Sequence, residues 1–138
     1  MTNMFNICRL IVFTLGLVIL SSAATVIAQE NLLDGKVFVG QSKEKHKRGV
    51  EEDELRFMNG EFQSIGYGQK GFNEGVYTAK AEADKIYFEA EPVSSKQGKI
   101  KWRGIVHKNS IEVNYRWSKK GWLSDTQKDY LFKGKLKQ

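Results

Sequence analysis

Apolar and polar residues alternate with a period of two from Lys36 to Leu136, and the chain contains a single proline. This alternation is typical of strands that bury one face and expose the other. No stretch has a convincing helical period, so the sequence predicts an all-β protein. With 138 residues and 12% aromatic side chains, the chain is long enough for one domain and apolar enough to pack a core.

The alternation divides into eight predicted strands. They cover residues 36–40, 54–58, 61–65, 76–83, 85–91, 99–107, 110–118 and 129–136. In the first strand, Val37 and Val39 are expected to point inward. Asn59-Gly60, between the second and third strands, is a strong hairpin signal because both positions tolerate positive φ. An open meander would leave two unpaired edges, so we expect an antiparallel up-and-down barrel closed by pairing of the last strand with the first.

The connections between these strands differ in length. Those after the second, fourth and sixth strands are tight, whereas the other four are long. The long connections cover residues 41–53, 66–75, 92–98 and 118–128. Because alternate connections of a meander lie at opposite ends of a barrel, the long ones are expected to share one rim. That rim is the predicted functional face.

Polar-tipped aromatic residues of the predicted inner face lie in the half of the barrel nearest this rim. They are Tyr77, Trp102, Tyr115, Trp117 and Tyr130. Such side chains suit a place where a ring meets apolar surface while its O–H or N–H reaches water or a ligand. Small inward residues such as Ala79 and Gly104 either leave room for a cavity or admit the rings opposite. The sequence leaves both alternatives open.

The start of the chain has the three-part layout of a secretory signal. Arg9 precedes the apolar run 10–20, and small residues follow. We expect residues 1–28 to be a signal peptide and residues 29–138 to be the barrel domain. The protein is therefore expected to be secreted, to the periplasm or to the medium.

An uncleaved anchor is the alternative, because the 19 residues from Leu10 to Ala28 carry no charge and match the thickness of a bilayer core. The only cysteine, Cys8, lies in the same segment. The exported domain is thus expected to have no disulfide partner and to depend on burial alone for its stability.

Few residues of the predicted domain suit catalysis or metal binding. His46 lies in a charged loop and His107 at a strand end, and neither is near an obvious serine and carboxylate pair. We therefore expect no enzyme activity and no cofactor. The acidic residues 51–53 are the one candidate for calcium, but three adjacent carboxylates in a loop usually remain hydrated.

Glycines punctuate the second long connection, at positions 66, 68, 71 and 75. A phosphate cradle would require a preceding parallel strand and a following helix, which the pattern does not predict. The glycines are better explained by a loop that folds back over the rim, with Tyr67 and Phe72 available to cover the mouth. Trp122 in the last long connection either packs on its neighbours or contacts a partner.

The formal net charge of +6 admits anionic partners. Basic side chains gather on the outer faces of the last strands. They are Lys101, Arg103, Arg116, Lys133 and Lys135. An anionic envelope surface is therefore a candidate partner, although lysines on strands also serve to block aggregation. Nucleic acid is not expected, because aromatic residues are not interleaved on this basic face.

Two segments, Leu-Asp-Gly-Lys-Val-Phe at 33–38 and Gly-Lys-Ile-Lys-Trp at 98–102, accompany the eight short strands. Together they resemble small uncharacterised bacterial exported proteins with a lipocalin-like, or calycin-type, β-barrel. The resemblance covers residues 33–136. It implies the barrel architecture and carries over no ligand.

We expect a non-enzymatic exported barrel that binds a small amphiphilic or aromatic ligand at its long-loop mouth. The expected lining is Tyr77, Trp102, Tyr115, Trp117 and Tyr130, with Trp122 and Phe72 as a lid. The alternative is a protein-interaction module, such as a periplasmic inhibitor of an envelope hydrolase, whose long loops plug a partner's cleft. In that case side chains fill the barrel.

Overall fold

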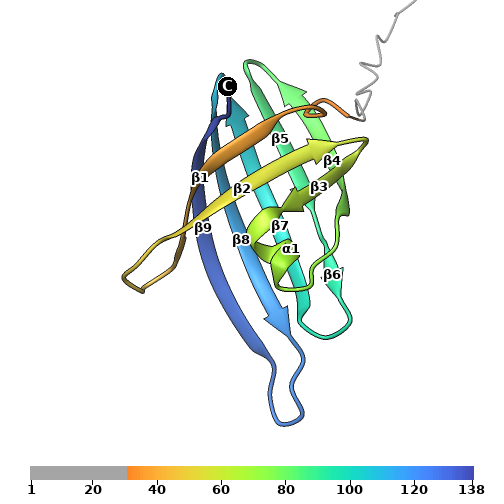
Figure 1. The fold of residues 1–138 in the computed structure, drawn as a ribbon, viewed down its shortest axis with the longest axis vertical. Helices are drawn as coiled ribbons and strands as arrows, with labels where there is room; N and C mark the ends of the chain where they lie inside the picture. Colours follow the sequence, from red (N-terminus) through yellow and green to blue (C-terminus); the bar gives the residue numbers. More distant parts are fainter. Residues whose placement is uncertain (1–30) are drawn as a thin grey trace, which may run out of the picture.

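The computed structural model describes residues 31–138 (Figure 1). Its elements are β1 (Val37–Glu44), β2 (Glu51–Met58), β3 (Glu61–Ser64), α1 (Ile65–Gln69), β4 (Gly75–Glu82), β5 (Lys85–Ala90), β6 (Val93–Ser94), β7 (Gly98–His107), β8 (Ser110–Lys119) and β9 (Thr126–Leu136). The predicted signal peptide, residues 1–28, lies outside the described residues.

The predicted closure of the sheet is confirmed. β9 pairs antiparallel with β1 from Phe38 opposite Leu136 to Glu44 opposite Tyr130. β5 pairs antiparallel with β7, which joins the two ends of the strand order. Eight strands therefore form a closed up-and-down barrel, with the two-residue β6 as an extra strand beside β7.

Each tight turn contains a residue in the left-handed region of φ. Asn59 and Gly60 have φ of 53° and 75°, as the Asn-Gly signal predicts. Ala83 and Lys108 adopt φ of 54° and 55° in the other two turns. The four longer connections follow alternate strands of a closed meander, so they share the opposite end of the barrel, as predicted.

Several strands are longer than the alternation predicts. β1 and β2 pair as far as Ser42 opposite Glu51, so their connection shrinks to residues 45–50. The connection between β8 and β9 shrinks in the same way, to residues 120–125. These extensions consist of polar residues, and backbone pairing continues through them without any apolar alternation to mark it.

The predicted inward face of the first strand is wrong. Phe38 is fully buried, whereas Val39 is 40% exposed. In Val37-Phe38-Val39 both phases of the alternation are apolar, so the pattern does not choose between them. The larger phenylalanine ring removes more apolar area from water, and it occupies the core.

The second long connection contains a short helix that the sequence analysis did not predict. Ser64 is its N-cap, and the Ser64 hydroxyl accepts a hydrogen bond from the Tyr67 N–H at 3.1 Å. A helix of five residues is too short to have a readable period of 3.6. The capping serine was the one local signal for it.

The inside of the barrel is packed with side chains. The buried hydrophobic residues are Leu33, Phe38, Leu55, Phe57, Phe62, Phe72, Tyr77, Ala79, Phe88, Ala90, Ile100, Trp102, Val106, Ile111, Val113, Tyr115 and Phe132. Gly104 contributes by its lack of a side chain, because a Cβ there would overlap the Phe88 ring. The small inward residues therefore make room for the large rings opposite them. Of the two alternatives that the sequence left open, a cavity or a filled interior, the structure has the filled interior.

The segment before β1 packs at the tight-turn end. Leu33 is fully buried, and the Gly35 N–H donates to the Phe57 carbonyl oxygen at 2.8 Å. Asp34 accepts hydrogen bonds from the Gly60 N–H in the β2–β3 turn. This segment thus covers the end of the barrel opposite the long connections.

Candidate functional site

Two features of the long-connection end are candidates for function. The first is an aromatic cluster inside the mouth, beneath α1. The second is the β8–β9 hairpin, which projects past the rest of the barrel (Figure 1). The aromatic cluster is largely buried, whereas the end of the hairpin is exposed to solvent. Only the exposed end of the hairpin can contact a partner without movement of the fold.

The aromatic cluster is built on neighbouring strands. Trp102 on β7 stacks on Tyr115 on β8, with ring centroids 4.0 Å apart. Tyr115 stacks in turn on Tyr130 on β9, at 4.9 Å and an interplanar angle of 7°. The register explains the stack, because Tyr115 lies directly opposite both Trp102 and Tyr130. Cross-strand aromatic pairs of this kind stabilise a sheet.

Tyr67 on α1 closes this cluster. Its ring lies edge-on to Trp102 at 5.7 Å and to Tyr115 at 5.6 Å. Phe72, 4% exposed, packs edge-on against Tyr67 from the other side. The glycine-containing connection therefore folds over the mouth with Tyr67 and Phe72 inside, as the sequence predicts.

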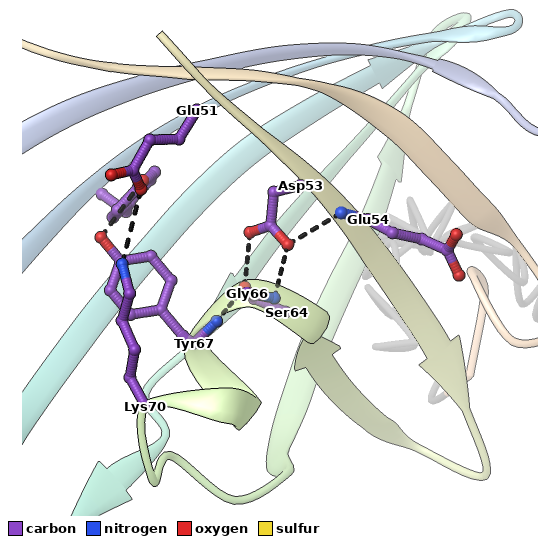
Figure 2. Close-up of polar contacts among 8 residues, drawn as sticks. Glu51, Asp53, Glu54, Ser64, Gly66, Tyr67 and Lys70 are labelled. Atoms are coloured by element: carbon purple, nitrogen blue, oxygen red, sulfur yellow. Dashed lines mark hydrogen bonds and ion pairs between the residues drawn. The ribbon is translucent and has the colours of Figure 1, made fainter.

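Asp53 on β2 holds α1 in this position (Figure 2). Its carboxylate accepts hydrogen bonds from the Gly66 N–H at 2.8 Å and from the Ser64 hydroxyl at 2.5 Å. It also accepts from the N–H of Glu54 at 2.8 Å. Beyond them, the Lys70 ammonium lies 3.4 Å from a Glu51 carboxylate oxygen. We call Asp53, Ser64 and Gly66 the α1 latch.

The hydroxyls of the cluster are held in their protonated form. Burial raises the pKa of Tyr115 to about 12 and places that of Tyr67 well above the ordinary value of 10. Burial also raises the pKa of Tyr130. These phenols are therefore neutral near pH 7, where they can exchange hydrogen bonds but do not act as bases.

Space around the cluster is small. A cavity of about 20 Å³, lined in part by Ser42, Tyr67 and Tyr115, has room for about one water molecule. Within the described part of the chain, Ser42 Oγ and Trp102 Nε1 are buried without a hydrogen-bond partner.

The predicted lining residues do not all meet. Trp102, Tyr115 and Tyr130 form one stack, as described above. Trp117 is half-buried and donates from Nε1 to the Gln97 carbonyl oxygen at 2.7 Å. Tyr77 points to the other end, where its hydroxyl donates to Asp34 at 2.7 Å and accepts from the Leu33 N–H. The backbone accounts for this direction, because β3 is short and the Tyr77 N–H donates to the Gly60 carbonyl oxygen in the β2–β3 turn at 3.1 Å.

The predicted lid of Phe72 and Trp122 is not assembled in this structure. Phe72 is buried under α1, whereas Trp122 is 95% exposed. Leu123, the next residue, is 85% exposed. Trp122 therefore does not pack on its loop neighbours in this structure, and its contact with a partner stays a prediction.

The remaining sequence candidates occupy other places. His107 lies at the tight-turn end, where its Nε2 is 2.7 Å from an Asp84 carboxylate oxygen, and His46 lies in the β1–β2 connection. The side chains of residues 51–53 separate, since Asp53 serves the α1 latch. Among residues 31–138, no group of three His, Cys, Asp or Glu side chains is arranged to hold a metal ion.

Salt bridges neutralise much of the basic outer face. Arg103 pairs with Glu89 at 3.1 Å, and Lys133 with Glu112 at 3.9 Å. Arg116 makes two hydrogen bonds to Asp129, at 2.6 and 3.1 Å. The strand faces are thus less suited to an anionic surface than their sequence indicates.

No family model, curated protein or solved structure matches this chain. The architecture, a closed antiparallel barrel, is consistent with the lipocalin-like resemblance at the level of fold. No helix within residues 31–138 is long and apolar enough to cross a membrane.

Proposed function

We propose that this chain is an exported, non-enzymatic interaction module, in which a filled barrel presents the β8–β9 hairpin as its contact element. The exposure of Trp122 (95%) and Leu123 (85%) at the hairpin tip carries the proposal. Large apolar side chains normally lie inside a folded domain. Two adjacent ones on a projecting hairpin are typical of a surface that contacts something else.

The filled barrel supports this function by acting as a rigid base. β8 pairs with β7 along nearly its whole length, and β9 pairs with β1 from Tyr130 onward. Beyond these neighbours, β8 and β9 continue to pair with each other as far as Lys119 opposite Thr126, so the end of the hairpin is still a paired ribbon. The tip is therefore held at a defined place at little cost in conformational entropy on binding.

A small-ligand carrier is the second candidate, and one observation favours it. Among residues 31–138, Trp102 Nε1 and Ser42 Oγ are buried and have no hydrogen-bond partner, and a bound polar group would supply one. For a ligand larger than a water molecule to enter, Tyr67 and α1 would have to move. The carrier hypothesis thus requires opening of the α1 latch.

Ligand titration separates the two candidates. For an interaction module, native mass spectrometry of the purified protein is expected to give the mass of the chain alone. Its tryptophan fluorescence is expected to stay unchanged across a library of soluble aromatic compounds. A compound that binds saturably and loses affinity in a Trp102→Phe variant would instead establish the carrier.

Photo-crosslinking in cells tests the contact element directly. Benzoylphenylalanine at position 122 is expected to form adducts, whereas the same group at Tyr87, an exposed position on β5, is expected to form none. Equal labelling from both positions, or none from position 122, would contradict the proposed function. The chemical nature of the adduct, protein or lipid, then identifies the class of partner.

A further inference from the structure

We propose that the β8–β9 hairpin tip docks on an anionic lipid bilayer, with Trp122 and Leu123 entering the interfacial layer. This inference rests on the proposed function and names the partner of the same contact element. It is argued from the shape, apolarity and charge of residues 119–128, which we call the hairpin tip.

The hairpin tip can reach a flat surface. Its last strand pair is Lys119 opposite Thr126, whereas β7 pairs with β8 no further than Ser118. The turn is compact, because a Cβ at Gly121 would overlap the Ser124 carbonyl oxygen. In Figure 1 this hairpin forms the lowest point of the molecule, past β6 and α1.

The apolar part of the hairpin tip has the composition of an interfacial anchor. Trp122 and Leu123 are the most exposed large hydrophobic residues of residues 31–138. Tryptophan prefers the boundary between headgroups and acyl chains, where its ring is apolar and its N–H can still bond. Two apolar residues are too few to span a membrane, so Trp122 and Leu123 would lie in the interface.

The charges beside these residues complement anionic headgroups. Lys119 and Lys120 precede Trp122, and Lys128 follows it, against one acidic residue, Asp125. Within residues 31–138, none of these three lysines forms a salt bridge, in contrast to the paired Arg103 and Lys133 of the strand faces. Lys128 lies over the Trp117 ring, 6.0 Å from its centroid. Lysines without a carboxylate partner strengthen binding to an anionic surface, and salt screens the effect.

A protein cleft is less favoured as the partner. A loop that plugs a cleft gains from shape complementarity, which needs contact area around the anchor as well as at its point. Here every residue from Lys119 to Gln127 is exposed, and Trp122 and Leu123 are the only large apolar residues among them. A planar, deformable and anionic surface can take up the two apolar side chains and attract the lysines beside them, and it needs no cavity of matching shape.

Vesicle binding tests the inference. The purified protein is mixed with vesicles of phosphatidylcholine alone or with phosphatidylglycerol added, and tryptophan emission is recorded. Trp102 is buried and Trp117 half-buried, so Trp122 dominates any change in environment. We expect a shift to shorter wavelength and quenching by brominated lipid with the anionic vesicles only, reduced by added salt.

Matched variants locate the binding. Trp122→Ala with Leu123→Ala, and separately Lys119→Gln with Lys120→Gln, are expected to weaken binding roughly tenfold or more. Lys85→Gln with Lys108→Gln removes the same charge from the tight-turn end of the barrel, where both lysines are exposed, and is expected to bind like the original chain. Any contribution from the apolar run 10–20 is common to all these proteins. An unchanged thermal midpoint confirms that each variant is folded.

Two outcomes overturn the inference and remain distinguishable from failure of the proposed function. If the tip variants bind anionic vesicles as the original chain does, the lipid contact lies elsewhere. If position 122 crosslinks to a protein and the vesicles leave the emission unchanged, the partner is a protein and the interaction module stands. Absence of any adduct at position 122 would contradict the interaction module itself.

Discussion

At the scale of single residues, identical side-chain chemistry leads to different roles. Glu51, Glu52 and Asp53 are consecutive carboxylates in the sequence. In the structure, Glu51 pairs with Lys70, Glu52 is exposed, and Asp53 accepts three hydrogen bonds. Of the three, Asp53 bonds to the first turn of α1, the helix that covers the aromatic cluster.

Replacement of Asp53 by alanine is expected to lower the free energy of unfolding by about 1.5–3 kcal/mol. The change removes the charged acceptor from two N–H groups and a hydroxyl, and hydrogen bonds to charged groups are worth about this much. Urea denaturation of the variant measures the loss. Glu52→Ala, which removes the same charge from the adjacent position, is expected to change stability by about 0.5 kcal/mol or less. Equal losses in both variants would contradict the latch.

At the scale of elements, the packing of β7 against its two neighbouring strands depends on a glycine. Gly104 lies opposite Phe88 on β5 and Val113 on β8. A Cβ there would overlap the Phe88 ring and approach Val113 Cγ2 to 2.9 Å. The glycine lets three neighbouring strands share one layer of the core, although its strand propensity is poor.

Gly104→Ala is expected to destabilise the protein by about 1–3 kcal/mol, because the added methyl group overlaps the Phe88 ring and overpacks this part of the core. Gly68→Ala in α1 is the matched control. Its Cβ would lie 3.4 Å from Gln63 Nε2, an ordinary contact, and alanine favours a helix over glycine. Thermal unfolding of both variants checks the contrast. A Gly104→Ala protein as stable as the original would show that the barrel has room inside.

At the scale of the whole molecule, closure of the barrel buries the hydroxyl groups of several tyrosines. Burial raises the pKa of Tyr115 to about 12, and it also raises the pKa of Tyr67, Tyr77 and Tyr130 from the ordinary value of 10. Above pH 10 the unfolded chain loses phenolic protons that the folded chain retains. The unfolded state then binds fewer protons, so the free energy of unfolding falls as pH rises.

This linkage predicts that the protein loses stability between about pH 10 and pH 12. Tyr115→Phe is expected to make the fall less steep, by up to about 1.4 kcal/mol per pH unit. The variant lacks the phenolic proton of Tyr115, which the folded chain retains and the unfolded chain loses. Urea denaturation at stepped pH values measures both slopes. The same slope in the variant and the original chain would mean that Tyr115 titrates alike in the folded and unfolded states.

The local pattern of the sequence was sufficient for the fold class. Period-two alternation, Asn59-Gly60 and the unequal connections predicted the strands, the turns and a closed barrel. These features are local, since each strand buries one face wherever its partner lies. The prediction also held for most inward residues, among them Trp102, Tyr115 and Phe132. It was wrong at Val37 and Val39, where neighbouring residues are equally apolar and only packing selects the face.

The candidate site depended on contacts between residues distant in the chain. Tyr67 on α1 reaches Tyr115 on β8 only because the barrel closes, whereas Asp53 reaches Gly66 across the β2–β3 hairpin. The sequence by itself determined a barrel with aromatic residues near one rim. Tertiary structure decided that these rings fill the interior, that Tyr77 serves the opposite end and that Trp122 remains in solvent. Burial is a property of the whole closed chain, and no single strand specifies it.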